Sequence, residues 1–287
     1  GAMLMPEGQH AKLNYEDIVL DRIRIVLVEP SHPGNIGGAA RAMKTMGMNQ
    51  LVLVNPGRFP DPQADWRAAG AMDLLDEAVV VDDLATALDG CRFVVGTSTR
   101  MRSIPWPVIS AKELGSVLAE QPRDSEIAVL FGREDSGLSN EELQSCHVHM
   151  QIPSSEVYGS LNLAMAVQVV CYEVFQHQIQ ADEQGLSNSA KDLATDGERA
   201  EMLTQGTRIW DKEPATVAQF DALMAHWEEV LVGSGFIKAE NPGHTLTRLR
   251  RMFMRHQLDE TEVQIMRGAL KHLAHGGLKD SDDRLNK

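Results

Sequence analysis

The chain has 287 residues, of which 43% are hydrophobic and 24% charged, and its formal net charge is −14. This composition is typical of a globular protein of about two domains and excludes disordered and collagen-like chains. The acidic balance also excludes a protein that holds nucleic acid by bulk positive charge, although a local basic patch is compatible with it.

Cysteine usage and the N-terminal segment indicate a cytoplasmic protein. Cys91, Cys146 and Cys171 lie far apart with no CxxC pair, which predicts reduced thiols rather than a disulfide framework. The initial Gly-Ala-Met resembles an expression scar and residues 4–20 carry no signal-peptide pattern, so we expect 1–20 to be a tag and an N-terminal extension. The longest apolar run, 161–170, is shorter than the ~20 residues of a bilayer span, and we expect no membrane partner.

Charge and composition divide the chain. Residues 181–201 contain six acidic and two basic residues and no aromatic one. Such a segment buries too little apolar surface to offset its chain entropy, so we expect a flexible linker there. One domain is then expected at 21–180 and a second at 202–287, where acidic and basic residues balance.

Within residues 21–180, short β-branched runs alternate with helical stretches. The predicted strands are 23–28, 51–54, 79–81, 93–96, 127–131 and 148–152, and the predicted helices are 36–46, 111–120, 140–145 and 161–179. Ser139 and Glu142 form a capping-box pattern at the start of the third helix. Continuous apolar strands alternating with helices predict an α/β fold, with a mostly parallel sheet covered by helices on both faces.

Residues 202–287 show no strand-like run. Helical patterns cover 215–232, 244–257 and 259–275, and Gly276-Gly277 provides a stop after the last of them. We therefore expect a small all-α C-terminal domain.

A glycine loop, SHPGNIGGAAR at 31–41, joins the first strand to the first helix. A Rossmann dinucleotide site is one alternative, but the GxGxxG spacing is absent, and Asn55 ends the second strand where that site needs an acid. A second alternative is that Gly37 and Gly38 allow close helix–sheet packing. Arg41 lies in the first two turns of an otherwise apolar helix, six residues after Asn35, and is either a functional side chain or an ordinary surface arginine.

The run Cys146-His147-Val148-His149 raises the question of a metal site. His147 and His149 would share one strand face, but no further pair of ligands is evident elsewhere in the sequence. An edge or half-buried strand explains the pattern more simply, and we expect no metal.

Three motifs occur in order along the first domain. They are NIGGAAR at 35–41, FGREDSGL at 131–138, and IP at 152–153 followed by SLNLA at 160–164. Together they resemble the SpoU branch of the SPOUT RNA methyltransferases. Further stretches at 41–47 (RAMKTMG), 96–98 (GTS), 104–107 (IPWP) and 140–143 (NEEL) are similar to those of the TrmJ-type enzymes.

The resemblance implies a fold and an activity. It implies a deep trefoil knot in the second half of the α/β domain, bound S-adenosylmethionine, and a homodimer with the active site at its interface and the 161–179 helix in its seam. The implied reaction is 2′-O-methylation of the ribose of cytidine or uridine at position 32, in the anticodon loop of tRNA. Alternatives are another tRNA or rRNA nucleotide, a non-catalytic RNA-binding protein and, more distantly, a dinucleotide oxidoreductase.

The resemblance also assigns a cofactor site to three strand-end loops. The implied residues are Thr97, Ser98, Thr99, Gly132, Arg133, Glu134, Ile152, Gly159, Ser160, Leu161 and Asn162. Main-chain amides of Ile152 and Leu161 can recognise adenine edges. Gly132 and Gly137 could equally be plain turn glycines, and Ser160 could be the N-cap of the helix that follows it.

For catalysis the resemblance assigns Arg41 to the ribose hydroxyl, with Asn35 and Ser160 positioning the reactants. Methyl transfer requires the ribose oxygen, the methyl carbon and the sulfur to be aligned. An arginine has a pKa above ~12 and is a poor base. We therefore favour a role in which Arg41 binds the neighbouring phosphate and stabilises the developing alkoxide.

Residues 241–258 contain no acid and four arginines, Arg248, Arg250, Arg251 and Arg255. On a helix, three of these share a face opposite Leu249 and Phe253. An ordinary solvated amphipathic helix would show the same pattern. In the context of the resemblance, we expect the four arginines to contact RNA phosphates, together with Arg100 and Arg102 of the first domain.

Overall fold

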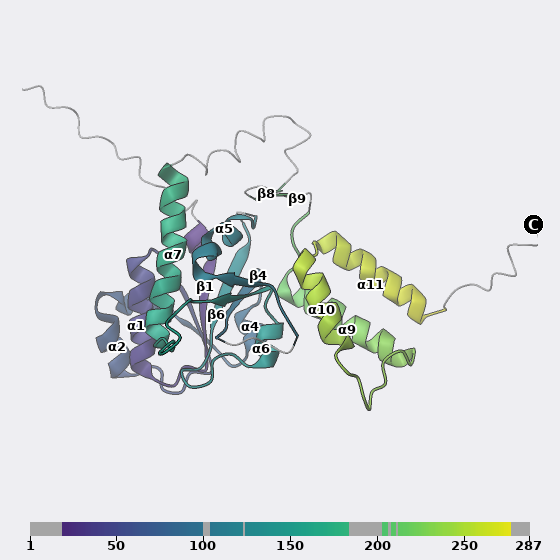
Figure 1. Cartoon of the computed structure of the whole chain (residues 1–287), viewed down its shortest axis with the longest axis horizontal. Coiled ribbons are helices and arrows are strands. Elements are labelled where there is room, and N and C mark those ends of the chain that lie inside the picture. The colour runs from purple at the N-terminus through teal and green to yellow at the C-terminus, as the bar shows by residue number, and fades with distance from the viewer. Residues whose placement is uncertain are drawn as a thin grey trace, which may run out of the picture.

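The computed structural model describes residues 19–99, 104–122, 124–183, 203–205, 208–210 and 212–276. The predicted N-terminal extension, most of the predicted linker, Arg100, Arg102 and Gly277 lie outside these residues. Within them, an α/β domain is followed by a helical domain (Figure 1).

Seven strands form one sheet in the order β3-β2-β1-β6-β4-β7-β5, and every pairing in it is parallel. The strands are β1 (Ile23–Val28), β2 (Gln50–Val54), β3 (Val79–Val81), β4 (Cys91–Thr97), β5 (Val108–Ser110), β6 (Glu126–Phe131) and β7 (Val148–Gln151). The predicted α/β class with a mostly parallel sheet is confirmed. The trefoil knot implied by the resemblance stays a prediction.

Helices cover both faces of this sheet. They are α1 (Pro33–Thr45), α2 (Pro62–Ala68), α3 (Met72–Asp76), α4 (Leu84–Ala87), α5 (Leu114–Ala119), α6 (Asn140–Gln144) and α7 (Leu163–Glu183). In β1, Ile25 and Leu27 belong to the apolar cluster shared with α1, α2 and α7, whereas Val26 and Val28 belong to the cluster shared with α4 and α6. This alternation is why both faces of the strand are apolar from Ile25 to Val28. Figure 1 shows α1, α2 and α7 together on one side of the sheet.

The paired glycines of the 31–41 loop allow α1 to pack closely on two other helices. A Cβ added to Gly37 would lie 2.1 Å from the carbonyl oxygen of Ala64 in α2, and one added to Gly38 would lie 2.8 Å from the Cβ of Ala164 in α7. The close-packing interpretation is therefore right, but the neighbours are helices rather than the sheet. The same contacts place the start of α1 beside the start of α7.

The helical domain consists of α9 (Val217–Gly233), α10 (Thr245–His256) and α11 (Glu260–Ala274), close to the predicted ranges. Its core contains apolar side chains of all three helices, including Phe220, Phe253 and Leu270. The prediction that residues 202–287 contain no strand is wrong. Here β8 (Leu203–Gln205) pairs antiparallel with β9 (Arg208–Trp210), and strands of three residues are too short to show a periodic pattern.

Helix α7 extends past its predicted end at 179 and into the predicted linker. Among the described residues, no helix combines the length and hydropathy that a membrane crossing needs. The three cysteines are buried and unpaired, as predicted.

His147 and His149 lie in the interior of the protein, and β7 is an inner strand rather than the edge or half-buried one we expected. The Nδ1 of His147 accepts a hydrogen bond from the backbone N–H of Val94 at 3.0 Å, and the Nε2 of His149 lies 2.7 Å from the carbonyl oxygen of Leu143. Both imidazoles thus form hydrogen bonds with backbone groups of the same chain. No cluster of three or more metal-ligating side chains lies within the part of the chain that the structure describes.

We expect His147 to make folding stability depend on pH. Burial lowers the pKa of His147 from 6.5 to about 3. As the pH falls below about 6.5 the unfolded chain takes up a proton that the folded chain does not, so stability is complete above that pH and decreases by ~1.4 kcal/mol per pH unit below it. Urea unfolding at pH 7.5 and 5.5 should show this loss in the wild type.

The matched variant is His147→Asn, whose side-chain oxygen can accept from Val94 but does not titrate. Between pH 7.5 and 5.5, the free energy of unfolding of this variant should fall by about 1.4 kcal/mol less than that of the wild type. The carboxyl pKa values of Glu134 and Glu142 lie below 4.5, outside the window. Equal pH dependence of the two proteins would contradict the prediction.

Candidate active site

A cavity of about 600 Å³ opens at the carboxyl ends of β4, β6 and β7. Its size is within the range of small-molecule sites, and the carboxyl ends of parallel strands are where α/β folds bind ligands. Every residue of the predicted cofactor set except Asn162 lines it. The wall also contains residues outside that set, several of them from the 131–138 and 152–164 motifs, namely Phe131, Asp135, Ser136, Gly137, Leu138, Met150, Gln151, Pro153, Ser154, Leu163 and Ala166.

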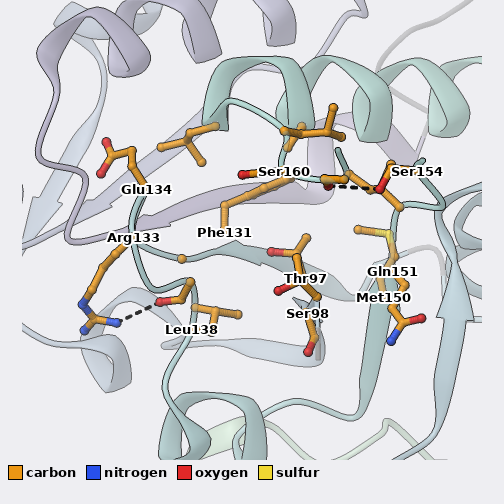
Figure 2. A pocket seen from close by; sticks show the side chains of 18 of the residues that line it. Thr97, Ser98, Phe131, Arg133, Glu134, Leu138, Met150, Gln151, Ser154 and Ser160 are labelled. Atoms are coloured by element: carbon orange, nitrogen blue, oxygen red, sulfur yellow. Dashed lines mark hydrogen bonds between the residues drawn. The ribbon is translucent and has the colours of Figure 1, made fainter. Parts of the chain in front are cut away.

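The first wall follows β4. The hydroxyl of Thr97 donates to the carbonyl oxygen of Leu130 at 2.9 Å, and the backbone N–H of Ser98 donates to the carbonyl oxygen of Met150 at 2.9 Å. These bonds tie the end of β4 to β6 on one side and to β7 on the other. Figure 2 shows Thr97 and Ser98 between the Arg133–Glu134 segment and Met150.

The second wall is a tight turn after β6. The backbone groups of Arg133 and Gly137 exchange hydrogen bonds of 3.2 and 2.9 Å, and Gly137 has a φ of +71°. A Cβ on Gly132 would lie 2.0 Å from the carbonyl carbon of Gly137. Both are therefore turn glycines, and the turn they make forms part of the cavity wall.

The guanidinium of Arg133 is held by carboxylates of its own chain. Its Nη1 lies 2.8 Å from Oε1 of Glu142, and its Nη2 also contacts Glu29. The hydrogen bond to Glu142 raises the pKa of Arg133 more than partial burial lowers it. The Arg133 side chain ties the turn to α6 and to the residue that follows β1. Its guanidinium therefore stabilises the cavity wall.

Glu134 joins the β6 turn to the start of α1. Its carboxylate accepts from the backbone N–H of Ser31 at 3.1 Å and of His32 at 3.2 Å. Partial burial raises the pKa of Glu134, but these backbone hydrogen bonds lower it more, and the net pKa lies below the usual value. A charged carboxylate at the N-terminus of α1 is also favoured by the helix dipole.

Asn35 and Asn162 connect the starts of the two helices. The Nδ2 of Asn162 donates to Oδ1 of Asn35 at 2.9 Å, and the Nδ2 of Asn35 lies 3.4 Å from Oε1 of Glu134. The Oδ1 of Asn162 accepts from the backbone N–H of Ala164 at 2.9 Å. Asn162, not Ser160, is thus the cap of this helix, and the N-cap interpretation of Ser160 is wrong.

The third wall is the exposed segment between β7 and α7. The hydroxyl of Ser154 donates to the carbonyl oxygen of Gly159 at 3.0 Å, which closes this segment into a loop. Ser160 and Leu161 follow directly and line the cavity. The predicted adenine-binding amides therefore lie at the cavity wall.

Arg41 lies outside the cavity of its own chain, exposed on α1. It stands one turn after Gly38, which contacts Ala164, and one turn before Thr45, whose hydroxyl lies 3.4 Å from Nε2 of Gln168. Residues three and four apart share a helix face, so Arg41 is on the side of α1 that runs along α7.

The tail arginines divide into two groups. Arg248 and Arg255 are exposed. Arg250 donates to Asp221 at 2.7 Å and stacks over the ring of Phe220, and Arg251 donates to the carbonyl oxygen of Pro105 at 3.2 Å. Arg250 and Arg251 are thus engaged within the chain, and the expected RNA contacts narrow to Arg248 and Arg255 on this helix.

Comparison with known families agrees with this arrangement. The model of the SpoU rRNA methylase family matches residues 22–172, more than half of the chain. The chain belongs to the SpoU methylase family. A second family model, the C-terminal domain of the tRNA methyltransferase TrmJ, matches residues 218–283 of this SpoU methylase.

Curated relatives identify the branch. A tRNA (cytidine/uridine/adenosine-2′-O-)-methyltransferase TrmJ of Pseudomonas aeruginosa is 46% identical, over 92% of this chain and 100% of the relative. A tRNA (cytidine/uridine-2′-O-)-methyltransferase TrmJ of Sodalis glossinidius is 43% identical, over 90% of this chain and 93% of the relative. The resemblance to TrmJ-type enzymes is confirmed.

Two solved structures of related proteins have the same fold as this chain. TrmJ from Z. mobilis ZM4 superposes with a TM-score of 0.69 at 27% identity, over 87% of this chain and 98% of its own. A probable methylase family protein from Haemophilus influenzae has a TM-score of 0.54 at 35% identity, over 93% of this chain and 100% of its own. The likeness to both extends beyond the SpoU domain into the rest of the chain.

Proposed function

We propose that this SpoU methylase transfers a methyl group from S-adenosylmethionine to the ribose 2′-hydroxyl of cytidine or uridine at position 32 in the anticodon loop of tRNA. The observation that carries the proposal is the contact of Asn162 with Asn35. Asn162 stands between the cavity-lining residues Leu161 and Leu163, so this contact ties their segment to the helix that bears Arg41. The activities named for the TrmJ relatives support the choice of reaction and substrate.

The cavity suits S-adenosylmethionine in size and in wall chemistry. The Gly132 turn brings main chain to the wall without a Cβ, and the amides of Ile152 and Leu161 offer backbone partners for an adenine edge. The bound cofactor supplies an electrophilic methyl group on a sulfonium. Glu134 orients the start of α1 rather than the ligand, because its carboxylate already accepts from Ser31 and His32.

In this proposal, Arg41 binds the phosphate next to the target ribose and stabilises the alkoxide as the hydroxyl loses its proton. Charge-assisted bonds of this kind act where negative charge develops. Asn35 holds the start of α1 against α7, and Ser160, exposed at the cavity wall, helps to place the ribose oxygen in line with the methyl group. The proton passes to water or to a phosphate oxygen, since a guanidinium is a poor base.

A homodimer would bring Arg41 to a cavity. Beside the start of α1, helix α7 and the residues before it expose large apolar side chains at Leu161 (40%), Met165 (62%) and Tyr172 (46%). A second copy seated on this face would cover these side chains. It would also carry its own Arg41 toward the cavity of the first chain, which that chain's Arg41 does not line.

The decisive experiment is mass-spectrometric nucleoside analysis of tRNA incubated with the protein and isotopically labelled S-adenosylmethionine. We expect label in 2′-O-methylcytidine or 2′-O-methyluridine, mapped to position 32. Label at another nucleotide would replace the substrate but keep the chemistry. If tRNA binds while no label enters and calorimetry detects no cofactor binding, a non-catalytic RNA-binding protein would be the better description.

We also place the enzyme in the cytoplasm. A tRNA substrate is available there, and the buried, unpaired cysteines suit a reducing compartment.

Arg248 and Arg255 should contribute directly to the salt dependence of tRNA binding. The variant with both changed to Gln should flatten the plot of log affinity against log salt by about 1.4–1.8, at ~0.7–0.9 per phosphate contact. Fluorescence titration of labelled tRNA at several salt concentrations measures the slope. Arg267→Gln, which removes one charge at an exposed arginine of α11, is the control and should leave the slope near that of the wild type. Equal slopes in the three proteins would contradict the prediction.

A further inference from the structure

The core of the helical domain contains a side chain from the methyltransferase domain. Trp106 is 7% exposed and packs in the same apolar cluster as Phe220, Leu223 and Phe253. It belongs to the IPWP stretch, which the proposed function does not use. One domain therefore completes its core with a residue of the other.

Trp106 also contacts the strand that ends at the cavity. Its Nε1 donates to the carbonyl oxygen of Cys146 at 2.7 Å. Its ring stacks on the imidazole of His149, with the ring centroids 5.6 Å apart and an angle of 5° between the ring planes. The backbone N–H of His149 donates to the carbonyl oxygen of Pro107 at 2.8 Å. These bonds fix the tryptophan segment against β7 directly before Met150, a residue of the cavity wall.

Strand β7 connects this tryptophan to the cavity. Met150 follows His149 directly, lines the cavity, and accepts a hydrogen bond from the backbone N–H of Ser98, which lines it too. On the other side of Trp106, the carbonyl oxygen of Pro105 accepts from Arg251 of α10. A series of contacts thus leads from the cavity wall, through β7 and Trp106, to the helical domain.

We propose that Trp106 is a positioning residue for methyl transfer, and that the docked helical domain sets the affinity for S-adenosylmethionine through it. The proposal rests on the proposed function. Trp106 and the Arg251–Pro105 bond hold residues 104–107 between β7 and the helical domain, and β7 leads into the wall that the cofactor contacts. The helical domain is then part of the cofactor site as well as a surface for tRNA.

This arrangement has a consequence for binding. If docking of the helical domain favours cofactor binding, cofactor binding must favour docking by the same factor. A tRNA held by Arg248 and Arg255, on either side of Arg251 along α10, would then bind more tightly to the enzyme that contains S-adenosylmethionine.

The test is isothermal titration of the full chain with S-adenosylmethionine in the absence of tRNA. Trp106→Ala should raise the dissociation constant by about 10-fold, within the range of coupling between sites, and Trp106→Phe, which keeps a ring to stack on His149, should restore part of the affinity. Leu270→Ala is the control, because it opens the same helical core at a buried residue of α11 and removes neither the bond of Trp106 to Cys146 nor that of Arg251 to Pro105. Its dissociation constant should equal that of the wild type.

Arg251→Ala provides a second variant that removes the bond to Pro105. It should raise the dissociation constant about 3-fold, the usual net value of one hydrogen bond, with Arg267→Ala as its control. Hydrogen exchange gives a readout besides binding, since the amide of Ser98 should exchange faster in Trp106→Ala than in Leu270→Ala. The proposal would be overturned if Trp106→Ala and Arg251→Ala both bind S-adenosylmethionine as tightly as the wild type. If Trp106→Ala does not fold, unchanged affinity of Arg251→Ala alone would overturn it. A wild type that binds no S-adenosylmethionine would refute the proposed function, and the exchange comparison would still decide the positioning role.

Discussion

Replacing Gly132 with alanine should lower the single-turnover rate of methyl transfer by more than about 100-fold, because displacing reacting groups by about 1 Å costs this much. The added Cβ would lie 2.0 Å from the carbonyl carbon of Gly137 and 2.2 Å from the backbone nitrogen of Leu138. Backbone cannot yield as a flexible side chain can, so the turn must open. Opening it moves the cavity wall and breaks the pair of hydrogen bonds between Arg133 and Gly137.

Gly137→Ala is the matched control in the same turn. No atom lies within 4 Å of a Cβ built there, and the substitution meets only the strain of a φ of +71°. That strain costs roughly 1–2 kcal/mol of folding stability, and at a temperature well below melting the rate should fall far less than that of Gly132→Ala, although Gly137 also lines the cavity. Rates measured with labelled S-adenosylmethionine, alongside thermal unfolding, separate the two. A Gly132→Ala enzyme with a wild-type rate would show that this turn does not shape the site.

The predictable part of the fold is the part set by burial on both faces of a sheet. The predicted boundaries of β1, β2 and β6 agree with the structure to within a residue, because their predicted ranges are apolar apart from Arg24 in β1. The boundaries of β3 also agree, although Val79 and Val80 are exposed. The capping box of Ser139 and Glu142 is likewise present. β5, α2 and α4, with three, seven and four residues, were not predicted, since they show neither a period nor a run as distinct as the three valines of β3.

The candidate site also has a part that the sequence predicts and a part that it does not. Strand-end motifs located the cavity, because parallel strands bring their carboxyl ends together. What sequence spacing could not show is which side chains are already occupied by partners in the chain. Glu134 holds the start of α1 and Arg133 pairs with Glu142. Nor could it show that Trp106 joins two domains, since that contact depends on how the domains pack.

Arg41→Ala should lower the single-turnover rate by about 100–1,000-fold, the usual cost of removing a donor to a developing oxyanion, and should leave stability unchanged. Arg41 is exposed, so no core packing depends on it. Lys44→Ala, on the same helix, is the control. It removes an exposed ion pair with Asp73 and should cost little stability and no rate. A small effect of Arg41→Ala, comparable to that of Lys44→Ala, would refute the assigned role.

The pH dependence of Arg41→Lys distinguishes a phosphate ligand from a base. A lysine carries its charge at neutral pH but fits a phosphate less well than a planar guanidinium does. We expect a reduced rate whose pH profile has the wild-type shape. A rate near that of the wild type, with an ionisation moved toward that of a lysine, would mean that residue 41 accepts the proton.

Mixing two inactive variants shows which chain supplies the arginine. One chain carries Arg41→Ala, and the other carries Ser136→Trp, which places an indole into the cavity from an exposed position of its wall. If a site combines the cavity of one chain with Arg41 of its partner, each mixed dimer has one intact site, and random exchange in a twofold-symmetric dimer restores about a quarter of wild-type activity. If each chain uses its own Arg41, no mixed dimer has an intact site and the mixture stays inactive. Because Arg41 lies outside the cavity of its own chain, we expect the mixture to recover about a quarter of wild-type activity.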